Sequence, residues 1–373
     1  MKPEKTLRED RETRLSVIEL CKKGHSLFKQ GKYMEAGIAF RKAVELEATN
    51  PYALTGLGDV SRKLHDFDRA CESYRAVLAH EPNNVFALRG LGDSYRGVQR
   101  YEEAIEVWMR YLNYRPNDIF VVTRIADSKK RLGFFDESEV YYKKALEIDP
   151  EDRYALLGLA DLYHKTGRSD LAIYYYDKVL EHETGFVHVL TMVGNLYRHK
   201  KEFEKAKDYY LRVLNVDPDN PYALFGMGDV CRWLRDYHGA IQSWERILTK
   251  HEGTINMLSR LGDAYRNVGD LESAETTYNN ILRRGYDKYA LLGLAKLRIL
   301  QGDVPAARRC LDTILDREPA DPRASIDQGE LLTSQGEGEA AADLYRQALR
   351  RPNLTSELAR ILEDRLEALG AGS

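Results

Sequence analysis

Apolar and small residues recur along this chain at helical spacing, and the whole pattern repeats every 34 residues. We number each repeat from 1 to 34 so that its first small residue is position 8. A second small residue then stands at position 20, and a large ring at position 24. From the second repeat to the eighth, position 8 is Gly58, Gly92, Ala126, Ala160, Gly194, Gly228 and Gly262, and position 24 is Tyr74, Trp108, Tyr142, Tyr176, Tyr210, Trp244 and Tyr278. A fixed period of this length predicts stacked repeats.

Each repeat is predicted to form two amphipathic helices, because apolar residues recur three and four positions apart within it. Small residues at positions 8 and 20 allow the two helices to approach closely, so that the ring at position 24 fits against the first helix. Turn residues separate the helices, with Gly133 and Gly167 at position 15 and Pro82 and Pro116 at position 32. Repeats are expected to start at residues 17, 51, 85, 119, 153, 187, 221, 255, 288 and 322.

These residues resemble the tetratricopeptide repeat pattern, in which Leu-Gly, Tyr, Ala, Phe and Pro recur with this period. The resemblance implies an all-α solenoid of helix-turn-helix pairs wound into a right-handed superhelix. Ten repeats are predicted over residues 17–355, preceded by a charged arm or helix at residues 1–16. Residues 356–373 are expected to form a capping helix, from Ser356 to Leu369, and a short tail.

The charge balance argues against a general polyanion binder, because 56 Lys and Arg residues face 59 Asp and Glu residues, for a net charge of −3. We therefore expect no nucleic acid partner. No apolar run approaches the roughly 18 residues that span a bilayer, so no membrane insertion is expected and the cytoplasm is the expected location. The four cysteines show no metal-ligand spacing and are expected to be buried or half-buried free thiols.

Catalysis is not expected, because the titratable residues form no recognisable catalytic constellation and the repeats leave no room for a separate catalytic domain. His188 and His199, for example, stand about 16 Å apart along one helix, too far to bind one ion. We expect no cofactor and no metal. Function is expected to reside on an exposed surface.

The tetratricopeptide resemblance implies that positions 2, 5, 9, 12 and 13 of the first helix line a concave groove. Position 9 is acidic or Asn in repeats 2–8: Asp59, Asp93, Asp127, Asp161, Asn195, Asp229 and Asp263. Position 12 is basic or His in the same repeats: Arg62, Arg96, Lys130, His164, Arg198, Arg232 and Arg266. Position 2 is mostly aromatic: Tyr52, Phe86, Phe120, Tyr154, Tyr222 and Tyr289, with His188 in repeat 6. These residues are the candidate peptide-binding groove.

Two plainer interpretations compete with a groove. Residues at positions 9 and 12 are three apart on a helix, so they could simply form surface ion pairs worth about 0.2–0.5 kcal/mol each. The aromatic residues at position 2 could instead fill the seam between neighbouring repeats. The sequence leaves both interpretations open.

We predict a non-enzymatic scaffold or adaptor that binds a partner polypeptide segment along its groove. The polar groups of an extended peptide would meet the residues at positions 9 and 12, and its apolar side chains would rest on the aromatic residues at position 2. The alternative is a structural protein that self-associates, or organises a complex, through its convex face or its ends. The sequence determines neither the partner nor the oligomeric state.

Overall fold

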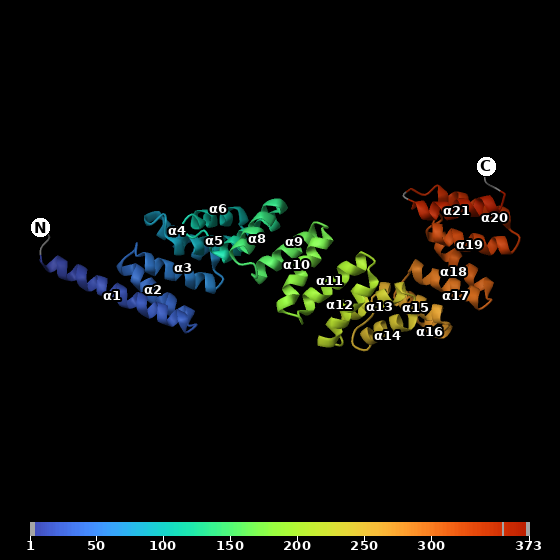
Figure 1. Cartoon of the computed structure of the whole chain (residues 1–373), viewed down its shortest axis with the longest axis horizontal. Helices are drawn as coiled ribbons and strands as arrows, with labels where there is room; N and C mark the ends of the chain where they lie inside the picture. The colour runs from blue at the N-terminus through green and yellow to red at the C-terminus, as the bar shows by residue number, and fades with distance from the viewer. Residues whose placement is uncertain (1–3, 353, 371–373) are drawn as a thin grey trace. The chain divides into compact units, whose positions relative to one another are not determined.

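The computed structural model describes residues 4–352 and 354–370, with side chains from residue 13 onward, and over these residues it contains helices and no strand. The predicted all-α class is confirmed. The helices follow one another as pairs (Figure 1) and the chain divides into two compact units, Met1–Thr184 and Gly185–Ser373. The division, between Thr184 and Gly185, lies near the end of the fifth predicted repeat.

Unit 1 contains five helix pairs, in which consecutive helices pack on one another. Its helices are α1 (Glu4–Lys29), α2 (Tyr33–Leu46), α3 (Pro51–Lys63), α4 (Phe67–His80), α5 (Val85–Gly97), α6 (Tyr101–Leu112), α7 (Ile119–Leu132), α8 (Phe135–Ile148), α9 (Arg153–Lys165) and α10 (Ser169–His182).

Unit 2 contains five further pairs and a final single helix. Its helices are α11 (Val187–His199), α12 (Phe203–Val216), α13 (Pro221–Trp233), α14 (Tyr237–Leu248), α15 (Ile255–Val268), α16 (Leu271–Arg283), α17 (Lys288–Leu300), α18 (Val304–Arg317), α19 (Pro322–Ser334), α20 (Gly338–Leu349) and α21 (Ser356–Ala368).

The first helix of every repeat from the second onward begins at the residue that the sequence period predicts. The residue just before such a helix usually carries a side-chain oxygen that accepts a hydrogen bond from the third residue of the helix. Asn50 accepts from the backbone nitrogen of Ala53 at 3.0 Å, and Asp152 from that of Ala155 at 2.7 Å. Helix α11 instead follows Phe186, which makes no side-chain cap bond, and this start lies at the division between the units.

The ring at position 24 is buried against glycine, as the sequence predicts. A Cβ atom added at Gly58 would lie 2.7 Å from the ring of Tyr74, so no larger residue fits without displacing the ring. Gly90, at position 6 of the next repeat, also lies against this ring, where an added Cβ atom would come within 2.3 Å of its Cζ atom. Where glycine stands at position 6, the ring therefore joins its own first helix to the first helix of the next repeat, and this shared contact extends the core from one repeat to the next.

The turn between the two helices of a repeat requires a left-handed residue at position 15. Gly133 adopts φ +87° and Gly167 adopts φ +75° there, which a glycine does without strain. In four repeats the same turn is made by a residue with a side chain, at φ 61–62°: His65, Gln99, Lys201 and Arg235. The backbone geometry is thus kept where the sequence lacks the glycine.

The two ends of the chain differ. Helix α1 begins at Glu4, so the charged segment expected at residues 1–16 is continuous with the first helix of repeat 1 from that residue on. Helix α21 packs on α19 and α20, and Leu362 and Leu366 on it are buried beside Tyr345. The predicted terminal helix therefore covers the apolar flank of the tenth repeat.

Candidate functional site

The acidic residues at position 9 are bound first of all by the tyrosine at position 24 of their own repeat. The hydroxyl of Tyr74 donates to Asp59 at 2.8 Å, and the hydroxyl of Tyr278 donates to Asp263 at 2.7 Å. Burial, and then the neighbouring carboxylate, raise the pKa of both tyrosines far above its usual value, so the hydroxyls keep their protons and act as donors. The same bond joins three other pairs: Tyr142 to Asp127, Tyr176 to Asp161 and Tyr210 to Asn195.

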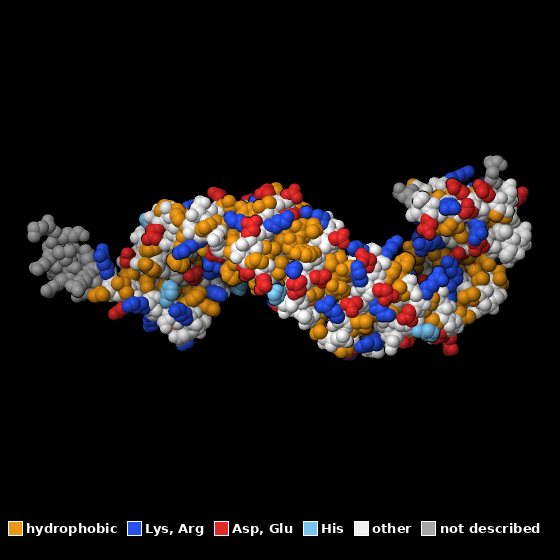
Figure 2. All heavy atoms as spheres, viewed as in Figure 1, with side chains coloured by type: hydrophobic (Ala, Val, Ile, Leu, Met, Phe, Trp, Pro, Cys, Tyr) orange, Lys and Arg blue, Asp and Glu red, His pale blue; other side chains and the backbone are white. Residues whose placement is uncertain are grey.

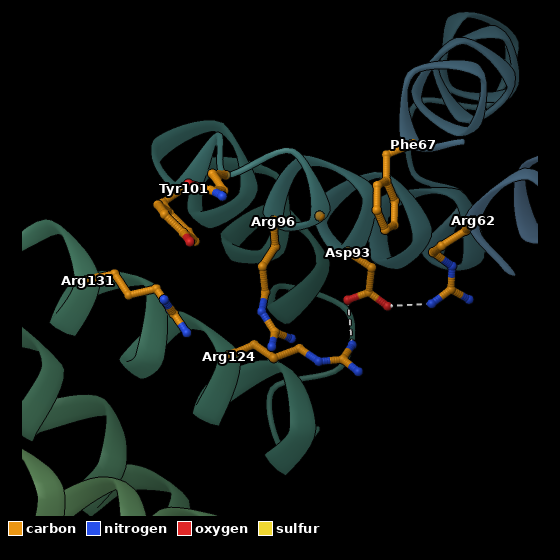
Figure 3. A pocket seen from close by; sticks show the side chains of 9 residues that line it. Arg62, Phe67, Asp93, Arg96, Tyr101, Arg124 and Arg131 are labelled. Carbon is orange, nitrogen blue, oxygen red and sulfur yellow. Dashed lines mark hydrogen bonds and ion pairs between the residues drawn. The ribbon is translucent and has the colours of Figure 1, made fainter. Parts of the chain in front are cut away.

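Repeats 3 and 7 differ because their ring is tryptophan, which has no hydroxyl to offer. In repeat 3 the carboxylate of Asp93 accepts from Arg62 at 3.0 Å and is also bound by Arg124. Arg62 lies on α3, Asp93 on α5 and Arg124 on α7, so one carboxylate links three successive repeats. Figure 3 shows Asp93 between the two guanidinium groups.

The same arrangement recurs in unit 2. There Asp229 accepts from Arg198 at 3.1 Å and is also bound by Arg260. Each of these residues stands 136 positions, or four repeats, after its counterpart in unit 1, as Trp244 does after Trp108. The two units therefore each contain one Arg–Asp–Arg bridge beside a buried tryptophan.

Arg124 and Arg260 were not predicted as site residues, although the sequence contains a signal for them. Both stand at position 6, which is glycine in five other repeats: Gly56, Gly90, Gly158, Gly226 and Gly293. Each of those glycines follows a repeat with Phe or Tyr at position 24, whereas the two arginines follow the repeats with tryptophan. Comparing the residue at position 6 of each repeat with the ring at position 24 of the preceding repeat would have identified these two arginines.

The interpretation of positions 9 and 12 as ion pairs within one helix holds for some repeats. Arg62 lies 3.3 Å from Asp59, Arg266 lies 3.3 Å from Asp263, and Lys130 lies 3.6 Å from Asp127. Arg232 approaches Asp229 only to 4.0 Å. Arg96 has no carboxylate partner among the described residues, because the neighbouring Asp93 is already bound by two other arginines.

The structure corrects two of the predicted groove residues. Asp229 is 1% exposed, and its carboxylate is enclosed by arginines. The side chain of Asp93 is 9% exposed. Neither carboxylate is a free acceptor for a peptide, because each is already bound by two arginines at the centre of an Arg–Asp–Arg bridge. Asp127 and Asp263 remain partly open on the surface of their helices.

The aromatic residues at position 2 do not fill the seam between repeats. Tyr52 is 71% exposed and Phe86 is 74% exposed. Together with Thr55 and Asp59 they line one cavity of about 290 Å³ in unit 1. The other predicted rings are exposed as well: Phe120, Tyr154, Tyr222 and Tyr289. The first helices thus present large exposed rings beside polar groups.

A second cavity in unit 1, of about 470 Å³, is lined by arginines. We call it the arginine pocket, and its charged residues are Arg62, Asp93, Arg96, Arg124 and Arg131. Figure 3 shows the side chains of Arg96 and Arg131 extending into the same space from α5 and α7. The aromatic ring of Tyr101 lies under the Arg131 guanidinium, 5.9 Å from ring centroid to Cζ.

The described residues contain no group of three or more His, Cys, Asp and Glu side chains that could hold a metal ion. Cys71 and Cys231 are buried, Cys21 and Cys310 are half-buried, and all four are free thiols, as the sequence predicted. Burial, followed by the nearby Asp236, raises the pKa of Cys231 to about 11. A thiol with so high a pKa is a poor nucleophile at neutral pH.

No helix in the described part of the chain is both long and apolar enough to cross a membrane. On the face drawn in Figure 2, acidic and basic side chains are interspersed with apolar ones. This mixture fits the nearly balanced composition of the chain.

Models of one family match most of the chain. Models described as tetratricopeptide repeat match residues 57–112, 123–184, 259–308 and 292–353, and others of the same description match residues 20–50 and 187–220. No curated protein matches the sequence.

Solved structures resemble the chain in fold. A tetratricopeptide repeat protein from Parabacteroides merdae is 20% identical, with a TM-score of 0.52 over 68% of this chain and 98% of its own. PilF of Pseudomonas aeruginosa is 20% identical, with a TM-score of 0.48 over 57% of this chain and 96% of its own. A MamA protein is 23% identical, with a TM-score of 0.43 over 45% of this chain and 92% of its own.

Proposed function

Because this chain belongs to the tetratricopeptide repeat family, we propose that it is a non-enzymatic scaffold or adaptor that binds a segment of a partner protein on its first helices. The exposure of the aromatic residues at position 2 carries the proposal. Rings such as Tyr52 and Phe86 expose apolar surface to water, and this surface is buried when a partner side chain packs on it.

The binding mode that we propose is an extended segment in the concave groove of the family. Apolar side chains of the segment rest on the position-2 rings, and its polar groups meet the open residues at positions 9 and 12. Asp127, Asp161 and Asp263 keep exposed oxygens for this purpose, whereas Asp93 and Asp229 stay in their bridges.

Capture of partners from the native cell extract tests this proposal. The Tyr52→Ala/Phe86→Ala/Tyr154→Ala variant removes three exposed rings from α3, α5 and α9 without cutting a hydrogen bond among the described residues. The matched control, Val140→Ala/Leu211→Ala, removes exposed apolar side chains from the second helices α8 and α12. We expect partners to be lost from the ring variant and kept by the control; equal capture by both would refute groove binding.

A second candidate function is self-association through the N-terminal end. Leu15, Ile18, Met34 and Ile38 are all at least half exposed on α1 and α2, whereas the C-terminal repeat is covered by α21. An apolar end of this kind can pair with another apolar surface. Light-scattering mass over a range of concentrations tests it, and a mass that stays that of one chain would exclude self-association.

A further inference from the structure

We propose that the arginine pocket of unit 1 binds a phosphorylated side chain of the partner segment. This inference rests on the proposed function, because it names a chemical group that the bound segment would carry. Four arginines line the pocket, and one carboxylate, Asp93, faces them. The pocket therefore has an excess of three positive charges within a cavity of about 470 Å³.

Two of the four arginines have no carboxylate partner within the described part of the chain. Arg62 and Arg124 are bound to Asp93. Arg96 forms no ion pair, and Arg131 lies over the ring of Tyr101 without reaching an acidic group. Both are exposed residues, so a ligand can reach them from solvent. Like charges held close together destabilise one another, and a bound anion relieves that repulsion.

The elements around the pocket hold the arginines in position. Arg124 is half-buried and bound to Asp93, and Figure 3 shows the side chain of Arg96 pointing toward that of Arg124. Arg131 stands on the same face of α7 as Arg124, seven residues or two helical turns further along, and its guanidinium points toward the same space. Planar guanidinium groups bind the oxygens of phosphate in pairs, so this arrangement offers several donors to one anion.

The excess charge favours a phosphoryl group over a carboxylate. A phosphorylated side chain carries about −1.5 to −2 charges at pH 7 and three strong acceptor oxygens. A carboxylate carries one charge and two oxygens, and Asp93 already supplies one carboxylate to this pocket. A dianion would leave the cluster close to neutral, whereas a second carboxylate would leave two positive charges without a partner.

Unit 2 provides an internal comparison. Gly97 lines the arginine pocket in unit 1, whereas the residue four repeats later is Trp233, whose ring stacks on Phe203 with centroids 5.7 Å apart. The guanidinium of Arg232, the counterpart of Arg96, lies 5.2 Å above the ring of Trp233. Asn267 stands where Arg131 stands in unit 1. The Arg–Asp–Arg bridge is thus kept in both units, but the two additional unpaired arginines belong to the pocket of unit 1.

The test uses the full chain and follows the side-chain Nε–Hε signals of arginine by NMR at constant ionic strength. The probes are inorganic phosphate and three peptides, Ac-Ala-Ala-X-Ala-Ala-NH₂, in which X is phosphoserine, serine or glutamate. The test variant is Arg96→Gln/Arg131→Gln. The matched control, Arg235→Gln/Arg283→Gln, removes the same charge from exposed residues of unit 2 that lie outside the candidate groove.

We expect the phosphoserine peptide to shift saturably the signal of Arg124, which lines the pocket and is kept in both variants, with affinity about tenfold weaker in the test variant and unchanged in the control. No saturable shift, or equal binding by both variants, would overturn the proposal. Equal binding of the glutamate peptide would assign the pocket to acidic side chains instead, and binding of inorganic phosphate without the peptide would assign it to the free ion. Either result would also overturn it.

The proposed function can fail separately. If the ring variant still captures all partners while the phosphoserine peptide binds the pocket, groove binding on the aromatic residues is wrong and the phosphoryl site remains. If the ring variant loses its partners while the peptide does not bind, the scaffold function remains and the phosphoryl site is wrong.

Discussion

The hydroxyl of Tyr176 donates a 2.7 Å hydrogen bond to the carboxylate of Asp161, fifteen residues earlier in the chain. This bond joins the second helix of a repeat to its first helix at the edge of the buried ring. Because five repeats contain it, the acidic residues at position 9 stabilise the helix pairs as well as contributing to the exposed face.

The first prediction concerns this bond. Tyr176→Phe keeps the buried ring but removes the donor, so we expect the fold to lose about 1–2 kcal/mol. Urea unfolding followed by circular dichroism measures the loss. Tyr154→Phe is the control, because that tyrosine is 68% exposed and lies in the same pair of helices. An unchanged midpoint for Tyr176→Phe would show that water replaces the bond without cost.

The second prediction concerns the buried bridge in unit 2. Asp229→Asn leaves Arg198 and Arg260 facing a neutral amide, and we expect a cost of about 2–4 kcal/mol, since the carboxylate is buried but both arginines keep some contact with water. Hydrogen exchange should be faster in α11, α13 and α15, the helices that the bridge joins. Asp208→Asn, an exposed residue on α12, should leave exchange unaltered. Exchange as slow as in the wild type would argue that the bridge contributes no stability.

The third prediction concerns the turns without glycine. Lys201 adopts φ 62°, a conformation that costs a residue with a side chain roughly 1–2 kcal/mol. Glycine adopts it freely but loses about 0.5–1 kcal/mol through the entropy of the unfolded chain. Lys201→Gly should therefore stabilise the fold by about 0.5–1 kcal/mol, seen as a higher melting temperature.

The reverse substitution provides the control for this turn. Gly167→Ala, at the same turn position with φ +75°, should lower the melting temperature. If both substitutions shifted the melting temperature in the same direction, the left-handed backbone would not be the cause.

The fourth prediction concerns acid. Asp321 caps α19 and lies 3.0 Å from Lys288. Burial alone would raise the pKa of Asp321, but the backbone amide of Ala324 and the ammonium group of Lys288 outweigh burial and hold that pKa below its usual range. The carboxylate therefore stabilises the fold above the pKa of the unfolded state, near 4, and this contribution is lost as the pH falls through the lower folded value.

Asp321→Asn tests this dependence. The variant should be less stable than the wild type at pH 7, and the difference should shrink below about pH 4. Thermal unfolding at several pH values measures it. Asp343→Asn removes the ion pair with Arg346; because the Asp343 side chain is 79% exposed, this variant should show little difference at any pH. If the difference in stability between Asp321→Asn and the wild type stayed constant down to pH 3, the charge of the Asp321 carboxylate would not have the role assigned to it.

The sequence by itself determined the repeat, its register and its internal packing. The predicted starts at residues 51, 85 and 119 are the starts of α3, α5 and α7, because helix caps, small residues and turn residues act within a few positions of one another. The fit of the Tyr74 ring against Gly58 follows from the same local pattern.

Only the tertiary structure decided which partner each carboxylate takes and which rings stay in water. The partners of Asp93 stand 31 residues before and after it, on helices of neighbouring repeats. Which partners bind the carboxylate depends on whether the buried ring beside it carries a hydroxyl. The packing of neighbouring helices likewise decides that Tyr52 is exposed and that two arginines of the pocket have no carboxylate partner within the described part of the chain. A repeat pattern specifies each helix pair through short-range contacts, whereas side-chain partners between repeats are set by distances that exist only once the pairs have stacked.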